Sequence, residues 1–268
     1  MIDPLSAYVH KASGRHGPII LMYHSVVSGV GTPNWPWAVS LKNFISHLDF
    51  LKSEGWKTVT MGELAAQPHN WDNRTIVLTF DDGYADNFAA FKEIKQRGMC
   101  ATWFIATASI GTAPNWQDND RGTTRLLNVE ELLSMQSNGM EIGSHTHNHV
   151  RLTGLKKNQV TLELTDSQKE LEDKLENKVL SFAYPYGDWN EDCELAVKNT
   201  GYKYACTTRP GWALRDNNPF RLRRISVFNS DNVSILARKL AFAANDVKWL
   251  HLAGYYVNRI KIRFLDKM

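Results

Sequence analysis

Two adjacent carboxylates stand out in the segment Thr-Phe-Asp-Asp-Gly-Tyr at residues 79–84. Neighbouring side chains of a strand point to opposite faces, so Asp81 and Asp82 reach one pocket only if the chain turns, which Gly83 permits. One carboxylate can then bind a metal ion, while the other acts as a general base toward water at that metal. Asp-Asp-Gly also suits a helix cap or a turn, and for the segment alone this alternative stays open.

Three histidines occur within five residues in the segment Ser-His-Thr-His-Asn-His at residues 144–149. His145 and His149 are four residues apart, so a helical turn would place both imidazoles on one face, whereas His147 would point elsewhere. With Asp82 they would supply three metal ligands and leave positions for water and substrate. This mixed ligation predicts one divalent transition metal, Zn²⁺ in the first place, with Co²⁺, Ni²⁺ or Fe²⁺ as alternatives.

The elements that must position these residues are short apolar runs that alternate with helix-like stretches, the pattern of a parallel α/β sheet or barrel. The candidate residues follow the ends of these runs, as His24, the Asp81–Asp82 pair and His145 do. Ligands bind at the carboxyl ends of parallel strands, so we expect these side chains to meet on one rim. The predicted strands cover residues 19–23, 76–80, 101–105, 140–143, 179–184, 202–207 and 222–227.

Helices are predicted where apolar residues recur at helical spacing, over residues 41–51 and 160–175. Asn128 and Glu131 form a capping pair, which predicts that another helix begins there. The polar segment 111–125 carries a tryptophan that looks exposed and predicts a long loop. It is either a lid facing the substrate or a plain surface loop.

The composition is that of a soluble globular protein, with 268 residues, of which 43% are hydrophobic and 22% charged. A net charge of +3 with scattered Lys and Arg argues against a nucleic-acid partner. The three cysteines have no disulfide or zinc-finger spacing, and no signal peptide is seen at the start. We therefore expect a cytoplasmic protein, with an exported mature form as the alternative.

The last residues differ from the rest of the chain, which divides the sequence into a catalytic domain at 1–245 and a tail at 246–268. The tail mixes aromatic and aliphatic residues with Lys and Arg. A basic amphipathic segment can lie on an anionic membrane, so peripheral membrane contact is one expectation. Packing of its apolar side on the domain is the other.

Three motifs carry a resemblance to a known family: Thr-Phe-Asp-Asp-Gly, then His-Thr-x-x-His, then Tyr-Pro-Tyr-Gly. Together they resemble the polysaccharide deacetylases, the NodB-homology domains of carbohydrate esterase family 4, over about residues 19–227. Leu-Met-Tyr-His at 21–24 and Phe-Ala-Tyr-Pro-Tyr-Gly at 182–187 are similar to the exopolysaccharide branch, which includes poly-N-acetylglucosamine deacetylases.

The resemblance implies a distorted (β/α)7 TIM-like barrel and a metal-dependent hydrolase that removes N-acetyl groups from an amino-sugar polymer. It implies Asp81 as the base and Asp82, His145 and His149 as the metal ligands. Water held at the metal would attack the acetamide carbonyl, and the backbone N–H of Tyr186 would stabilise the oxyanion. Ester deacetylation and a catalytically weak glycan-binding module remain the alternative functions.

The chain departs from the family pattern at two positions. Many members carry an arginine that orients the base where this chain has Ala183, so Arg223 or Arg224 is a candidate replacement beside Asp81, or both face solvent. No late histidine follows a clear strand to protonate the leaving amine. His24 is a candidate for that role or for substrate contact, with a structural role as the alternative.

Overall fold

The apolar runs of the chain form a parallel sheet that curls into a barrel. The computed structural model describes residues 2–14, 17–29, 31–67, 69, 71–116 and 124–249, and its main sheet has the order β10-β1-β5-β6-β7-β8-β9, with β4 paired to β5. The strands of this sheet are β1 (Ile19–Tyr23), β4 (Lys57–Thr58), β5 (Thr75–Phe80), β6 (Thr102–Ile105), β7 (Glu141–Ser144), β8 (Ser181–Ala183), β9 (Tyr204–Cys206) and β10 (Ile225–Ser226).

One short segment joins the two edges of the sheet. Ile225 in β10 pairs in parallel with Leu21 in β1, and Leu222, three residues earlier, forms a parallel bridge with Cys206 in β9. Residues 222–226 therefore contact both β1 and β9, and the sheet closes on itself. This confirms the predicted distorted (β/α)7 barrel.

The strands bury both faces, as in other barrels whose helices cover the outside. The inner side chains form one apolar cluster, with Ile20, Val77 and Phe104 among its members. The outer side chains pack against the helices in a second, larger cluster. Glycine is required at position 143 inside the barrel, because a Cβ there would lie 2.5 Å from Oγ of Ser181 and 2.7 Å from ring atoms of Phe104.

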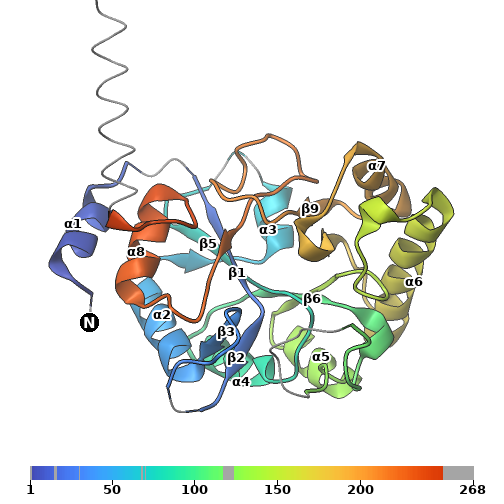
Figure 1. Ribbon diagram of the computed structural model, residues 1–268, viewed down its shortest axis with the longest axis horizontal. Coiled ribbons are helices and arrows are strands. Elements are labelled where there is room, and N and C mark those ends of the chain that lie inside the picture. Colours follow the sequence, from blue (N-terminus) through green and yellow to red (C-terminus); the bar gives the residue numbers. More distant parts are fainter. Residues whose placement is uncertain are drawn as a thin grey trace, which may run out of the picture.

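The helices surround the strands, with α1 against α8 at one edge and α6 beside α7 at the opposite edge (Figure 1). The predicted helices at 41–51 and 160–175 are found in α2 and α6, and Asn128 and Glu131 form a capping box at the start of α5. The helices are α1 (Pro4–Ala12), α2 (Leu41–Ser53), α3 (Met61–Ala66), α4 (Asn87–Gln96), α5 (Val129–Gln136), α6 (Lys157–Leu175), α7 (Glu191–Thr200) and α8 (Val233–Phe242), with the 3-10 turns η1 (Thr107–Ser109), η2 (Leu152–Gly154) and η3 (Pro185–Gly187).

Two further strands, β2 (Ser25–Val27) and β3 (Ala38–Ser40), form a small parallel sheet that the sequence patterns did not predict. None of the helices in the described ranges has the length and apolar character of a membrane span. Residues 250–268 of the predicted tail and residues 117–123 of the predicted loop lie outside the described residues. The domain division and the membrane contact therefore stay predictions.

Candidate active site

Asp81 and Arg224 meet at the mouth of the barrel because each belongs to a series of alternate side chains that face the inside of the barrel. Val77, Thr79 and Asp81 alternate along one face of β5, and Leu222 and Arg224 do so before β10. Arg224 Nη1 donates to Asp81 Oδ1 over 2.6 Å, and Arg224 Nη2 donates to Asp81 Oδ2 over 2.8 Å. The structure thus brings Arg224 to Asp81 as a bidentate pair, with the guanidinium fully buried.

The surroundings of Arg224 fix its guanidinium in place. Its Nε donates to the carbonyl of Thr207 over 2.9 Å, and Nη1 also donates to the hydroxyl of Thr79 over 3.2 Å. Burial by itself would raise the pKa of Asp81, but the charge and hydrogen bonds of Arg224 outweigh it and hold that pKa below its usual value. Asp81 is therefore an ionised carboxylate with a fixed orientation.

Asp82 turns toward the same mouth because the chain leaves the strand at this residue. Its φ is 72°, in the left-handed region, and Gly83 follows with φ 88°. The turn lies at Asp82 itself as well as at Gly83, and the N–H of Gly83 donates to the carbonyl of Asp81 over 2.9 Å. A left-handed aspartate is uncommon, and such strain concentrates at functional sites.

His145 and His149 converge on Asp82 without the helical turn that the spacing predicted. Residues 145–149 form a non-helical turn in which Thr146 and His149 have φ values of 65° and 55°. The prediction of a helical turn was therefore wrong, because left-handed residues interrupt a right-handed helix. Nε2 of His145 lies 3.4 Å from Asp82 Oδ1, and Nε2 of His149 lies 3.1 Å from the same oxygen.

The three side chains fit a metal ion. Their ligand atoms lie within 4.8 Å of one another, and all three residues are buried. In a tetrahedral site, two ligands at about 2.0–2.2 Å from one ion are separated by roughly 3.0–3.5 Å, which matches the two distances to Asp82 Oδ1. Nδ1 of His145 donates to the carbonyl of Ala183 over 2.7 Å, which fixes the ring with its Nε2 toward Asp82. The pKa of Asp82 lies well below its usual value, because His149 and His145 outweigh the effect of burial.

Aromatic side chains surround His149. The ring of Trp116 stacks on it with a centroid distance of 4.3 Å, and the ring of Tyr186 meets it edge-on at 4.8 Å. Tyr186 has a left-handed φ of 59°, and the guanidinium of Arg151 lies 4.1 Å from its ring centroid. The expected exposed tryptophan of the 111–125 loop is therefore half-buried against a candidate ligand.

His24 lies on the rim between β1 and β2, where its ring packs against Trp37 at 4.6 Å and meets Trp35 edge-on at 6.2 Å. Its backbone carbonyl accepts a hydrogen bond from Asn87 over 2.7 Å. Burial is the main cause that lowers the pKa of His24, and the nearby Asp82 and Asp81 only partly oppose it. Its imidazole is therefore neutral near pH 7.

Arg223, the other candidate partner of Asp81, lies elsewhere, and His147 lies away from Asp82 as its spacing predicted. Arg223 makes a two-pronged pair with Asp216, at 2.7 and 2.9 Å, rather than with Asp81. His147 contacts the hydroxyl of Thr107 at 2.9 Å and the carboxylate of Glu170 at 3.3 Å.

Sequence reasoning missed Thr79 and the carbonyl of Ala183 as partners of the site. The position of Thr79, two residues before Asp81 on the same strand face, was the available signal for the first.

The model of the polysaccharide deacetylase family matches residues 69–205, about half of the chain. The Bacillus subtilis (strain 168) protein YxkH, itself assigned to the polysaccharide deacetylases, is 33% identical over 229 residues, which are 84% of this chain and 76% of YxkH. The chain belongs to the polysaccharide deacetylase family. The family model covers both Asp81–Asp82 and His145–His149.

This polysaccharide deacetylase also resembles a poly-β-1,6-N-acetyl-D-glucosamine N-deacetylase of Staphylococcus aureus (strain MRSA252), with 25% identity over 78% of this chain and 74% of that one. Among solved structures, the Streptococcus pyogenes deacetylase PplD in complex with acetate has a TM-score of 0.73 at 24% identity, covering 84% of this chain and 99% of that one. IcaB from Ammonifex degensii has a TM-score of 0.72 at 22% identity, covering 84% and 97%. The relatives confirm the resemblance to the deacetylases, and the solved structures confirm the fold.

Proposed function

We propose that this deacetylase is a divalent-metal-dependent hydrolase that removes N-acetyl groups from an N-acetylated amino-sugar polysaccharide or glycoconjugate. The observation that carries the proposal is the fixed, ionised Asp81 directly beside the trio of Asp82, His145 and His149. A base and a metal site at one barrel mouth are the two parts that amide hydrolysis by water requires. A glycan-binding module has no need of a buried Asp81–Arg224 pair.

Asp81 is the proposed general base. Its carboxylate takes a proton from water as the water oxygen attacks the acetamide carbonyl. The C–N bond then breaks as the nitrogen takes up a proton, which gives acetate and a free amine on the sugar. Arg224 is a positioning residue, because it orients Asp81 through two hydrogen bonds and keeps it ionised. It supplies the charge that the family arginine, replaced here by Ala183, supplies in other members.

Asp82, His145 and His149 are the proposed metal ligands. A bound divalent ion, Zn²⁺ in the first place, would lower the pKa of a water ligand and polarise the carbonyl. The carbonyl of Ala183 holds the ring of His145 in the orientation that such a site needs.

Two further residues face the substrate in this proposal. The backbone N–H of Tyr186, beside His149, stabilises the negative charge that develops on the carbonyl oxygen. His24 is neutral, so it suits hydrogen bonding to the sugar better than donation of a proton. A substrate containing an N-acetyl group is supported by the name of the Staphylococcus aureus relative, which acts on poly-N-acetylglucosamine.

Comparing activity on an amide substrate with activity on an ester substrate distinguishes an N-deacetylase from an O-deacetylase. We expect acetate release from β-1,6-linked N-acetylglucosamine oligomers with a kcat/KM well above that for O-acetylated xylan oligomers, measured on the zinc-loaded protein. Release from the xylan oligomers alone would replace the N-deacetylase proposal with esterase activity. Acetate release from neither substrate, in a protein that binds both, would favour a glycan-binding module.

Replacing Arg224 by methionine is expected to destabilise the protein by about 3–5 kcal/mol, because Asp81 would remain as a buried charge without a partner. Arg223→Met is the matched control at the adjacent position. Its pair with Asp216 lies nearer the surface, so its loss should cost only about 1 kcal/mol. Urea unfolding measures both values, and equal losses would contradict the assigned role.

The pH dependence of kcat/KM in the Arg224→Met variant gives a second test. A purely structural role of Arg224 would leave this pH dependence unchanged. Without Arg224, burial raises the pKa of Asp81. A base works only when deprotonated, so activity is lost as the pH falls through its pKa. The acid limb of the kcat/KM profile should therefore move to higher pH in Arg224→Met and stay in place in Arg223→Met.

A further inference from the structure

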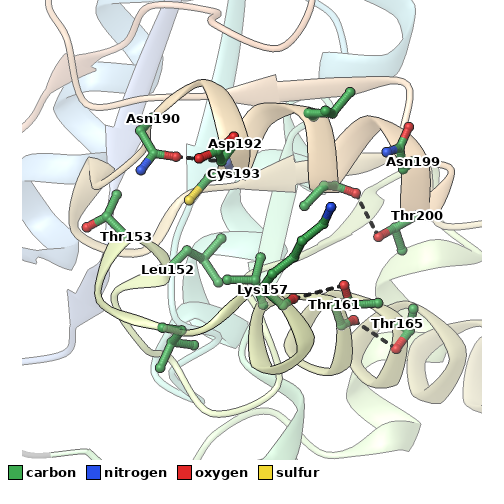
Figure 2. Close-up of a pocket in the computed structure, with 14 residues that line it drawn as sticks. Leu152, Thr153, Lys157, Thr161, Thr165, Asn190, Asp192, Cys193, Asn199 and Thr200 are labelled. Atoms are coloured by element: carbon green, nitrogen blue, oxygen red, sulfur yellow. Dashed lines mark hydrogen bonds between the residues drawn. The ribbon is translucent and has the colours of Figure 1, made fainter.

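A cavity of about 390 Å³ lies in the groove between α6 and α7 (Figure 2). Thr153 and Asn190 lie at one of its ends, Thr165 and Asn199 lie at the other, and Lys157 extends from α6 toward α7. The volume is within the range of pockets that bind small ligands, about 300–1,000 Å³. Neither the candidate ligands nor Asp81 line this cavity.

The end formed by Thr153 and Asn190 adjoins the candidate active site through two linked turns. Thr153 in η2 follows His149 by four residues, and Asn190 follows Tyr186 by four. Four residues span at most about 14 Å, a distance that a short oligosaccharide covers.

A chain of contacts fixes these two turns relative to one another. The hydroxyl of Thr153 donates to Asp188 Oδ2 over 2.5 Å, the guanidinium of Arg151 covers the ring of Tyr186, and that ring contacts His149. The η2 and η3 turns thus form one wall that continues from the candidate metal site to the cavity.

The lining has the mixed character that a sugar ring requires. Leu152, Leu155 and Val160 give it an aliphatic side, against which the C–H groups of a pyranose can pack. The lining amide of Asn199 and the side-chain NH2 of Asn190, whose oxygen already accepts from the N–H of Cys193, can hydrogen-bond to hydroxyl and acetamide groups. The charged lining residues are Lys157 and Asp192, which have opposite signs, so a neutral ligand suits the cavity better than an ion.

We propose that this cavity binds a second sugar residue of the same polymer, at a distance from the residue that reacts at Asp81. The inference rests on the proposed function for the identity of the polymer. A second subsite makes binding depend on chain length, because only a substrate long enough to reach from the barrel mouth to the α6–α7 groove gains its contacts.

Thr161→Trp tests the subsite, because it fills the cavity from an exposed position on α6. Leu162→Trp is the matched control, since Leu162 is 56% exposed and does not line the cavity. Both are made in an Asp81→Asn background, which prevents turnover, and calorimetry gives the Kd for N-acetylglucosamine dimers and hexamers. We expect Thr161→Trp to weaken hexamer binding about tenfold, the loss of one moderately bound group, with no change for the dimer. Leu162→Trp should change neither.

Equal Kd values for the hexamer in the two tryptophan variants would overturn the subsite. So would hexamer binding no tighter than dimer binding in the Asp81→Asn protein that carries neither tryptophan. Loss of dimer binding in Thr161→Trp would mean that the substitution disturbs the barrel mouth instead, and would also count against it. A failure of the proposed function looks different. In that case the protein with Asp81 intact releases no acetate from any oligomer, while the binding measurements still decide the cavity.

Discussion

Replacing Asp81 by asparagine is expected to lower the rate of acetate release by about 10²- to 10⁴-fold, the usual contribution of a positioned general base. The change removes the proton acceptor but keeps the size of the side chain and one oxygen for Arg224. Asp82, His145 and His149 are unchanged, so metal content should stay at the wild-type level. Initial rates on N-acetylglucosamine oligomers and metal analysis of the same sample measure both expectations.

Metal retention also serves as the folding control for this variant. Arg224 stays buried with a weakened partner, so some loss of stability is expected. The three candidate ligands follow two different strands and meet only in the folded barrel. An Asp81→Asn protein that holds its metal is therefore folded at the site, and wild-type rates in such a protein would exclude Asp81 as the base.

Replacing His145 by alanine is expected to cost more than about 100-fold in metal affinity. Loss of an outer hydrogen-bond partner of a metal ligand already costs about 10- to 100-fold, and loss of the ligand itself removes a direct bond. Activity should fall with occupancy and recover in part when excess Zn²⁺ is added. Competition with a fluorescent zinc chelator measures the affinity.

His147→Ala is the matched control, two residues away and of the same residue type. The ring of His147 contacts Thr107 and Glu170, away from Asp82, so its loss should leave metal affinity unchanged. If His145→Ala and His147→Ala bind zinc equally well, the assignment of the ligands is wrong.

Much of the fold could be predicted because the buried strands have apolar side chains on both faces. The seven runs all contain strands of the barrel, although β8, β9 and β10 are markedly shorter than their runs. In β9, for example, Thr207 leaves the ladder and donates to Leu222 of the closing segment. The small β2–β3 sheet could not be predicted. Its strands are three residues long, and their pairing depends on tertiary contacts such as that between Val26 and Asn87.

The positions of the strand ends predict that the site residues converge. They do not predict the backbone conformation of these residues or the choice of Arg224 as the partner of Asp81. The left-handed conformations of Asp82, Thr146 and His149 run against local propensity, and the surrounding structure imposes them. Arg224 lies 143 residues from Asp81, so no local pattern favours it over Arg223. Only the alternation on the strand before β10, known once that strand is placed, directs Arg224 inward.

Metal content and acetate release, measured on one preparation of the unaltered protein before and after chelation, decide whether deacetylation depends on a bound ion. We expect about one divalent ion per chain, because one set of three ligands holds one ion. We also expect acetate release from N-acetylglucosamine oligomers that disappears with the ion and returns when Zn²⁺ is restored. Undiminished acetate release from metal-free protein would contradict this dependence.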